Sequence, residues 1–139
     1  MKLILIIVFL NSISFAHAVE LKAFQSDGCS AFPDGTLEQN NLWLICCFEH
    51  DKSYWQGGTY QDRKNADKSL KQCVADVGEP AIARLMLAAV RVGGSPYLPT
   101  SFRWGYGWPY PRGYKALTDA EQTRVRAMLR KVSDKHWEN

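Results

Sequence analysis

The sequence predicts an all-α fold with long loops in a single exported domain. Apolar residues recur at three- and four-residue spacing in several segments, and glycines or prolines mark where those segments end. The chain of 139 residues contains four cysteines. An even number of cysteines in an exported chain is typical of disulfides rather than free thiols, so we expect two disulfides.

The first 18 residues have the features of a secretory signal peptide. Lys2 is followed by the apolar run LILIIVFL, and the AHA of residues 16–18 is typical of a signal-peptidase site. The apolar run is short for a membrane span, which takes about 20 apolar residues, although an uncleaved anchor is the alternative. We therefore expect residues 1–18 to be removed, residues 19–139 to form one domain, and the protein to be secreted or periplasmic.

Turn-forming residues fill the start of the predicted domain. Residues 19–35 are expected to be a loop with ordered turns, because SDGCSAFPDGT contains two Asp-Gly pairs and a proline. From Leu37 to about Trp55 the pattern is helical and contains neither proline nor glycine. We expect this first helix to stop at the glycine pair of residues 57–58.

Two further helices are expected before residue 95. One runs from Tyr60 or Gln61 to Val77, with one apolar stripe along its length. The next opens at Pro80, where the missing proline N–H is harmless, and ends at the glycine pair of residues 93–94. Its sequence AIARLMLAAVRV is nearly all apolar, so we expect this helix to be well buried.

Residues 95–114 are rich in proline and aromatic residues and show no regular period. We expect an ordered loop that its own rings pack. Two interpretations are open for its aromatic side chains. They either cover the third helix as part of the core, or, with Arg103 and Arg112 beside them, they meet a lipid interface.

A final helix is predicted from a capping sequence at its N-terminus. Thr118 and Glu121 have the spacing of a capping box, which opens a helix expected to reach about Lys135.

Charge argues against nucleic acid as a partner. The formal net charge is +3, with 17 basic and 14 acidic residues interspersed along the chain and no basic run. A nucleic-acid-binding domain usually gathers its basic residues.

The segment CCFEHDKSYW, residues 46–55, concentrates reactive side chains. On a helix, Cys47, His50, Asp51 and Tyr54 share one face. Three interpretations compete. The cysteines and His50 bind zinc, although adjacent helical cysteines point about 100° apart and suit it poorly. Alternatively His50 is an inert core residue between disulfides, or the helix carries a general base and a metal ligand.

A resemblance favours the last interpretation. The pattern C-C-x-x-H-D-x-x-Y at residues 46–54 resembles the motif of the secreted phospholipase A2 family. The DGC of residues 27–29 stands where that family has its calcium loop, and ADKSLKQC has an aspartate six residues before a cysteine, as in the family's second long helix. The resemblance covers residues 24–77. The loop is poorer in glycine than the vertebrate type and is nearer to bacterial and fungal variants.

The resemblance implies two disulfides, Cys29–Cys47 and Cys46–Cys73. It implies a fold in which two antiparallel, disulfide-linked helices carry the site, with a calcium-type loop before them. Further helices and the aromatic loop follow.

Catalytic roles are implied for three residues. His50 would act as the base that activates water. If the helices are antiparallel, a rise of about 1.5 Å per residue places His50 within side-chain reach of Asp67, which would then orient the imidazole. Tyr54, on the same helix face as His50, would hydrogen-bond Asp67.

Calcium is the implied cofactor. Its oxygen ligands would come from the side chains of Asp51 and Asp27 and the carbonyl of Gly28. The Gly28 N–H would donate to the oxyanion of the reaction. We expect Asp34 to be a turn residue rather than a ligand.

The implied function is calcium-dependent hydrolysis of the sn-2 ester of phospholipids, at a membrane or micelle surface and by a monomer. The alternative is a non-catalytic secreted module that binds lipid or protein on the same disulfide-linked scaffold. A structural protein that attaches to membranes is a third hypothesis, under which liposome binding would not depend on His50.

Overall fold

The computed structural model describes residues 20–136, with side chains to residue 132, so the expected signal peptide lies outside the described residues. Within that part of the chain there are four helices and no strand, which confirms the all-α fold. The helices are α1 (Leu44–Gln56), α2 (Tyr60–Asp76), α3 (Pro80–Gly93) and α4 (Asp119–His136). None of these helices is long and apolar enough to cross a membrane.

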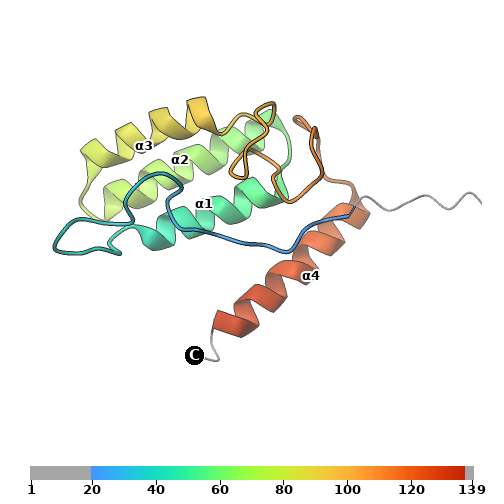
Figure 1. Ribbon diagram of the computed structural model, residues 1–139, viewed down its shortest axis with the longest axis horizontal. Helices are drawn as coiled ribbons and strands as arrows, with labels where there is room; N and C mark the ends of the chain where they lie inside the picture. The colour runs from blue at the N-terminus through green and yellow to red at the C-terminus, as the bar shows by residue number, and fades with distance from the viewer. Residues whose placement is uncertain (1–19, 137–139) are drawn as a thin grey trace, which may run out of the picture.

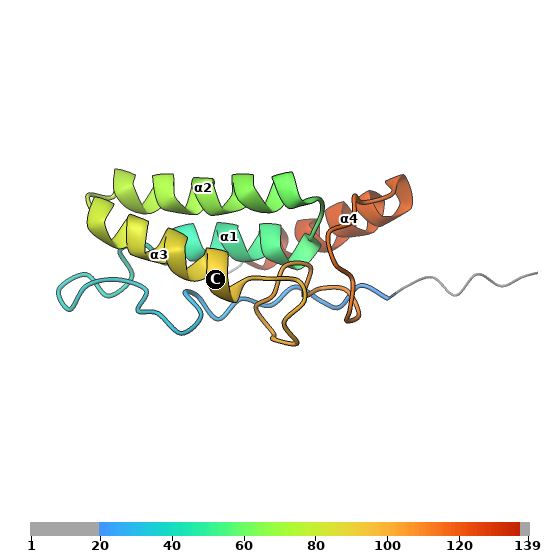
Figure 2. The same ribbon diagram turned by 90° about the horizontal axis from the view of Figure 1, so that it is seen from above.

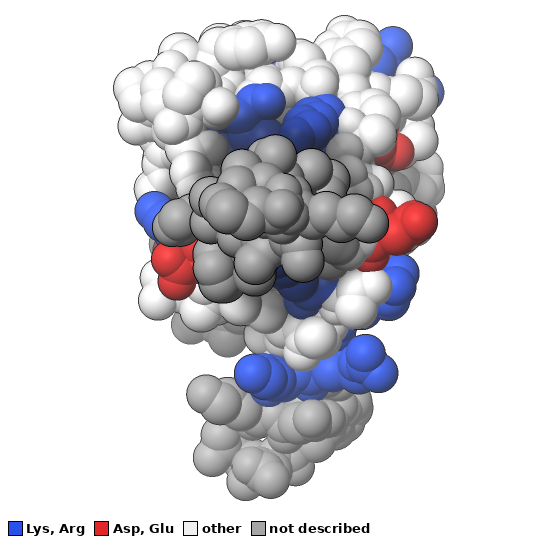
Figure 3. Space-filling model, turned by 90° about the vertical axis from the view of Figure 1, so that its right-hand side faces the viewer, with Lys and Arg blue, Asp and Glu red and all other residues white. Residues whose placement is uncertain are grey.

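The first three helices form one antiparallel layer. Helix α2 contacts both α1 and α3, and the chain reverses direction at each short connection (Figure 1; Figure 2). Helix α4 leaves this layer near the C-terminal end of α1 (Figure 1). On the end of the molecule shown in Figure 3, Lys and Arg side chains lie in several separate groups, with Asp and Glu beside some of them.

Two disulfides fix α1 to its neighbours. Cys29–Cys47 joins the preceding loop to α1, and Cys46–Cys73 joins α1 to α2. All four cysteines are paired. Closing a loop of 27 residues by the second disulfide is worth roughly 3–4 kcal/mol. Disulfides of this kind are typical of an extracytoplasmic protein.

The start of α1 differs from the sequence prediction. The helix begins at Leu44 and not at Leu37, and residues 37–43 form turns instead. Thr36 N–H donates to the Gln39 carbonyl, and Gln39 N–H donates to Thr36 Oγ1. These local bonds offer the backbone an alternative to the helix, as hydroxyl side chains commonly do.

The expectation that α3 is well buried was wrong. Only Ala83 and Met86 are buried along it, while Leu85 is 55% and Val92 79% exposed. Helix α3 packs against α2 along one face, and no other helix of the described chain makes comparable contact with it. An apolar composition therefore predicted the helix but not what covers it.

The aromatic loop caps the C-terminal end of α1. The last four carbonyls of a helix have no partner within it, and capping groups must supply one. Ser53 O accepts from Gly57 N–H at the turn. Donors of residues 105–108 serve the other three carbonyls: Gly105 N–H to Tyr54 O (2.6 Å), Gly107 N–H to Trp55 O (3.1 Å) and Trp108 Nε1–H to Gln56 O (2.7 Å).

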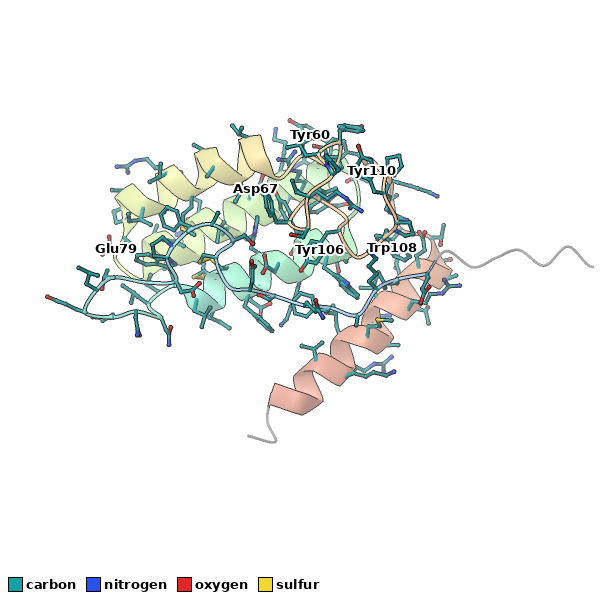
Figure 4. All side chains as sticks on the ribbon, viewed as in Figure 1. Tyr60, Asp67, Glu79, Tyr106, Trp108 and Tyr110 are labelled. Atoms are coloured by element: carbon teal, nitrogen blue, oxygen red, sulfur yellow. A yellow bond between two sulfur atoms is a disulfide. The ribbon has the colours of Figure 1, made fainter. Side chains whose placement is uncertain are left out.

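The tryptophans of this loop are core residues. Trp104 is 1% exposed and packs with Tyr54, while Trp108 is fully buried and packs with Trp55. They pack at the end of α1, and Trp104 N–H also donates to the carbonyl of Gly94, the C-cap of α3. Trp108 is labelled in Figure 4. Tyr110, by contrast, is about half exposed.

The predicted capping box opens α4. Thr118 N–H donates to Glu121 Oε2 at 2.9 Å, and Glu121 N–H donates to Thr118 Oγ1. Arg112 adds two hydrogen bonds of 3.0 Å to the same carboxylate. Val125 then packs α4 into the cluster that contains Trp55.

The cap on α1 leaves no room for a methyl group at Gly107. A Cβ at this position would lie 2.5 Å from Trp55 Nε1, so Gly107→Ala is expected to cost roughly 1–3 kcal/mol in the free energy of unfolding by urea. Gly93→Ala is the matched control, because the nearest atom to its Cβ is 3.9 Å away. The control is expected to be neutral or stabilising by up to about 1 kcal/mol. Equal losses in both variants would contradict the close packing.

Arg112 lowers the pKa of Glu121 to about 2. Because the folded pKa is depressed, the ionised carboxylate stabilises the fold above about pH 4.5, and this contribution is lost as the pH falls through about 2. We expect Glu121→Gln to cost roughly 1 kcal/mol at pH 7 in urea unfolding, with the difference from the unmodified protein vanishing near pH 2. A difference independent of pH would contradict this ion pair.

Candidate active site

A histidine and an aspartate meet between α1 and α2. His50, 8% exposed, lies in α1. Asp67, fully buried and labelled in Figure 4, lies in α2. His50 Nε2 is 3.1 Å from Asp67 Oδ1. Tyr54, one turn after His50, donates its hydroxyl to the same oxygen at 2.7 Å. The structure therefore brings together the three residues to which the sequence analysis assigned catalytic roles.

Asp67 is held in its ionised form. Burial alone would raise its pKa, but hydrogen bonds from His50 and Tyr54 and the positive charge of Arg63 bring the pKa of Asp67 below its ordinary value. Arg91 Nε also lies 2.6 Å from Asp67 Oδ2, an ion pair whose atoms are not aligned as a hydrogen bond.

The bond to Asp67 sets the tautomer of His50. Because the carboxylate accepts at Nε2, the neutral ring carries its hydrogen there and leaves Nδ1 as an acceptor. No hydrogen bond to Nδ1 occurs within residues 20–136. Nδ1 is thus the ring atom available to take a proton.

An apolar cavity of about 240 Å³ adjoins His50. Its wall also includes residues of the loop before α1, of α2 and of α3: Phe32, Leu70, Met86 and Val90. Such a wall suits a hydrocarbon chain rather than a polar substrate.

Asp51 is a partly buried carboxylate in the wall of this cavity. Burial is the main cause that raises its pKa to about 7, and the negative charges of Asp27 and Asp34 raise it further, against a hydrogen bond from Ser26. Ser26 Oγ donates to Asp51 Oδ2 at 2.6 Å. The position concentrates negative charge.

The loop before α1 depends on Gly28. Its φ of +79° favours glycine, and a Cβ would lie 2.4 Å from Asp34 Oδ1. Gly28 N–H donates to Ser26 Oγ at 3.2 Å, so this group, which the resemblance assigned to the oxyanion, has a partner in the loop. Asp34 accepts from Cys29 N–H, the contact expected of a turn residue.

Oxygen atoms are the metal donors that this region offers. Within the described chain, no group of three or more His, Cys, Asp or Glu side chains is arranged to hold a metal ion. The disulfides also exclude a thiolate zinc site, because all four cysteines are bonded to each other. The Asp51 and Asp27 carboxylates and the Gly28 carbonyl remain as donors, with Asp27 Oδ1 accepting from Ser30 Oγ.

Asp51 also lies in the wall of a second, more polar cavity of about 930 Å³. Ser26 and Asp27 line it from the loop before α1, and Tyr106 and Tyr110 line it from the aromatic loop. Both tyrosines are labelled in Figure 4. Asp51 borders both cavities, so a molecule that spans them would pass this carboxylate.

Sequence reasoning missed several residues of this region. Ser26 binds Asp51, and its place three residues before Cys29 was a signal, because the Cys29–Cys47 disulfide brings that loop to α1. Arg63 lies one turn before Asp67 in α2, a spacing that puts both on one helix face. Arg91 gave no signal, because its contact depends on how α3 packs.

Comparisons with protein-family models, with curated proteins and with solved structures found no match for this chain.

The crowded carboxylates give a prediction for Asp51. Because its folded pKa is raised, the neutral acid stabilises the fold, and that stability is lost as the pH rises from about 4 through about 7. In chelator at pH 8, Asp51→Asn is expected to be more stable than the unmodified protein by roughly 1–2 kcal/mol, by urea unfolding. Glu49→Gln, an exposed neighbour paired with Lys52, is the control and should change little. A destabilised Asp51→Asn would contradict the raised pKa of this partly buried carboxylate.

Proposed function

We propose that this protein hydrolyses the sn-2 ester of phospholipids with calcium as cofactor, as a phospholipase A2-type enzyme of the exported compartment. One observation carries the proposal: His50 has Nε2 bonded to the buried Asp67, has Nδ1 free, and borders an apolar cavity next to Asp51. This arrangement combines a general base, a place for a hydrocarbon chain and a carboxylate for a cation.

The chemistry follows from the free ring nitrogen. A water molecule donates a proton to His50 Nδ1 as its oxygen attacks the ester carbonyl carbon. Asp67 stabilises the imidazolium that forms, because its ionised carboxylate accepts from Nε2–H. The same proton then passes from Nδ1 to the departing alcohol oxygen as the carbon–oxygen bond breaks. The products are a fatty acid and a lysophospholipid, and no serine nucleophile is required.

The apolar cavity supports the choice of substrate. Met86 and Val90 of α3 and Leu70 of α2 line it together with His50, so an acyl chain bound there would bring its ester to the base. Because these side chains are apolar, water would reach the ester only beside His50, where the attack takes place.

Calcium fits the donor set. The Asp51 carboxylate is partly buried and feels the negative charges of Asp27 and Asp34, a concentration of charge that a hard cation would relieve. Asp51, Asp27 and the Gly28 carbonyl would hold the ion, with water completing a ligand set that the described side chains do not fill. When bound, calcium supplies positive charge for the phosphate and the developing oxyanion.

The test is fatty-acid release from mixed phospholipid–detergent micelles by the oxidised protein that begins at residue 19. Release is expected to require calcium and to fall by about 100-fold or more in His50→Gln, since general base catalysis contributes at least that much. Glu49→Gln, exposed one position before His50, should keep full activity. Release that persists in chelator or in His50→Gln would contradict the assigned roles.

A second candidate is a non-catalytic module that binds lipid or protein. The observation that favours it is Ser26, which bonds both Gly28 N–H and the Asp51 carboxylate and so occupies two of the implied functional groups. Under this candidate the folded protein releases no fatty acid in any condition. Calcium would then not raise its thermal stability, whereas the enzyme is stabilised by calcium and loses that effect in Asp51→Asn.

A further inference from the structure

We propose that Arg63 is a positioning residue that directs the Tyr54 hydroxyl onto Asp67 and thereby fixes the carboxylate that orients His50. The catalytic part of this inference rests on the proposed function, and its structural part stands by itself.

Arg63 is a buried arginine with all its contacts inside the molecule. Its side chain projects from α2, and the residue is 5% exposed. Nε donates to Tyr54 Oη at 3.1 Å, and Nη1 donates to the Tyr114 hydroxyl. Nη2 donates to the carbonyls of Val90 and Arg91 at 2.8 and 2.9 Å. One guanidinium thus reaches α1, the C-terminal part of α3 and the segment before α4.

The Tyr54 hydroxyl has one hydrogen and a choice of two acceptors. Asp67 Oδ1 lies 2.7 Å and the Val90 carbonyl 3.4 Å from Tyr54 Oη. Arg63 bonds both the competing acceptor, the Val90 carbonyl, and the Tyr54 hydroxyl oxygen itself. Its Nη2 takes one of the two lone pairs of the Val90 carbonyl, and its Nε fills a lone pair of Tyr54 Oη, so that both contacts favour donation of the hydroxyl hydrogen to Asp67.

The direction of this hydrogen matters for His50. Asp67 Oδ1 accepts from both Tyr54 and His50. The Tyr54 hydroxyl therefore helps to fix the carboxylate oxygen that orients the His50 ring. Burial and the nearby Asp67 charge raise the pKa of Tyr54, which keeps the phenol protonated as a donor. A hydroxyl turned to Val90 would leave Asp67 with one fewer donor and His50 less firmly oriented.

Arg63 also ties α3 to α1, so a loss of activity alone would not separate positioning from stability. A double-mutant cycle does, with Arg63→Lys, Tyr54→Phe and the pair together. A lysine ammonium keeps the charge but cannot reach Tyr54 Oη and Val90 O together. Arg112→Lys is the matched control, because Arg112 is an arginine with a 7% exposed side chain paired with Glu121 away from the site.

We expect Arg63→Lys to lower kcat roughly tenfold with KM changed less than about twofold, as loss of a partner behind a functional histidine does. In the Tyr54→Phe background the same substitution should change kcat by less than about twofold, because the hydroxyl that Arg63 directs is absent. Arg112→Lys should leave kcat unchanged. Wild-type kcat in Arg63→Lys, or additive effects in the cycle, would overturn the proposal.

The hydroxyl itself provides a readout that does not depend on activity. In the NMR spectrum of the unmodified protein, the Tyr54 hydroxyl proton should exchange slowly and show a cross-peak to the Asp67 β-protons. A cross-peak to Val90 in its place would overturn the inference. The positioning by Arg63 stands if this cross-peak to Asp67 weakens or is lost in Arg63→Lys, even where the protein releases no fatty acid and the proposed function fails. An unchanged cross-peak in Arg63→Lys would overturn it.

Discussion

The fold depends on compensation of one buried charge. The Asp67 carboxylate is fully buried, and its partners come from different helices: His50 and Tyr54 from α1, and Arg91 from α3. Removing one partner of a buried charge typically costs about 3–5 kcal/mol, a large share of the stability of a small domain. The same carboxylate that the proposed reaction uses therefore links the three helices. Loss of its contacts would weaken both the site and the packing of these helices.

Helix α1 is held at both ends, which keeps His50 in place. Near its start the adjacent Cys46 and Cys47 bind α2 and the preceding loop, and at its end the aromatic loop fills the free carbonyls. The disulfide to the loop also brings Ser26 to Asp51. A functional residue on a helix fixed in this way is pre-organised, so the proposed catalysis needs little rearrangement of the base. Gly105 and Gly107 of the aromatic loop also help to fix α1, because without side chains their backbones can approach its last carbonyls closely.

Much of the fold was predictable from the sequence, and the exceptions have physical causes. Glycine pairs and capping residues are local signals, so the ends of α2 and α3 and the start of α4 were close to those expected. The start of α1 was wrong because turn hydrogen bonds around Thr36 competed with the helical pattern. The burial of α3 was wrong because periodicity does not tell what lies opposite a face. His50 and Asp67 could be placed from helix geometry once a disulfide was assumed. Arg63 could not, because its partners lie far apart in the chain.

The proposed function requires that water, activated by His50, attacks the sn-2 ester of a phospholipid. The most direct test uses a phospholipid with different acyl chains at its two positions, in calcium and ¹⁸O-labelled water, with products identified by mass spectrometry. We expect the sn-2 chain to be released as the free acid carrying ¹⁸O, and the lysophospholipid to keep the sn-1 chain without label. Release of the sn-1 chain, or an unlabelled fatty acid, would contradict it.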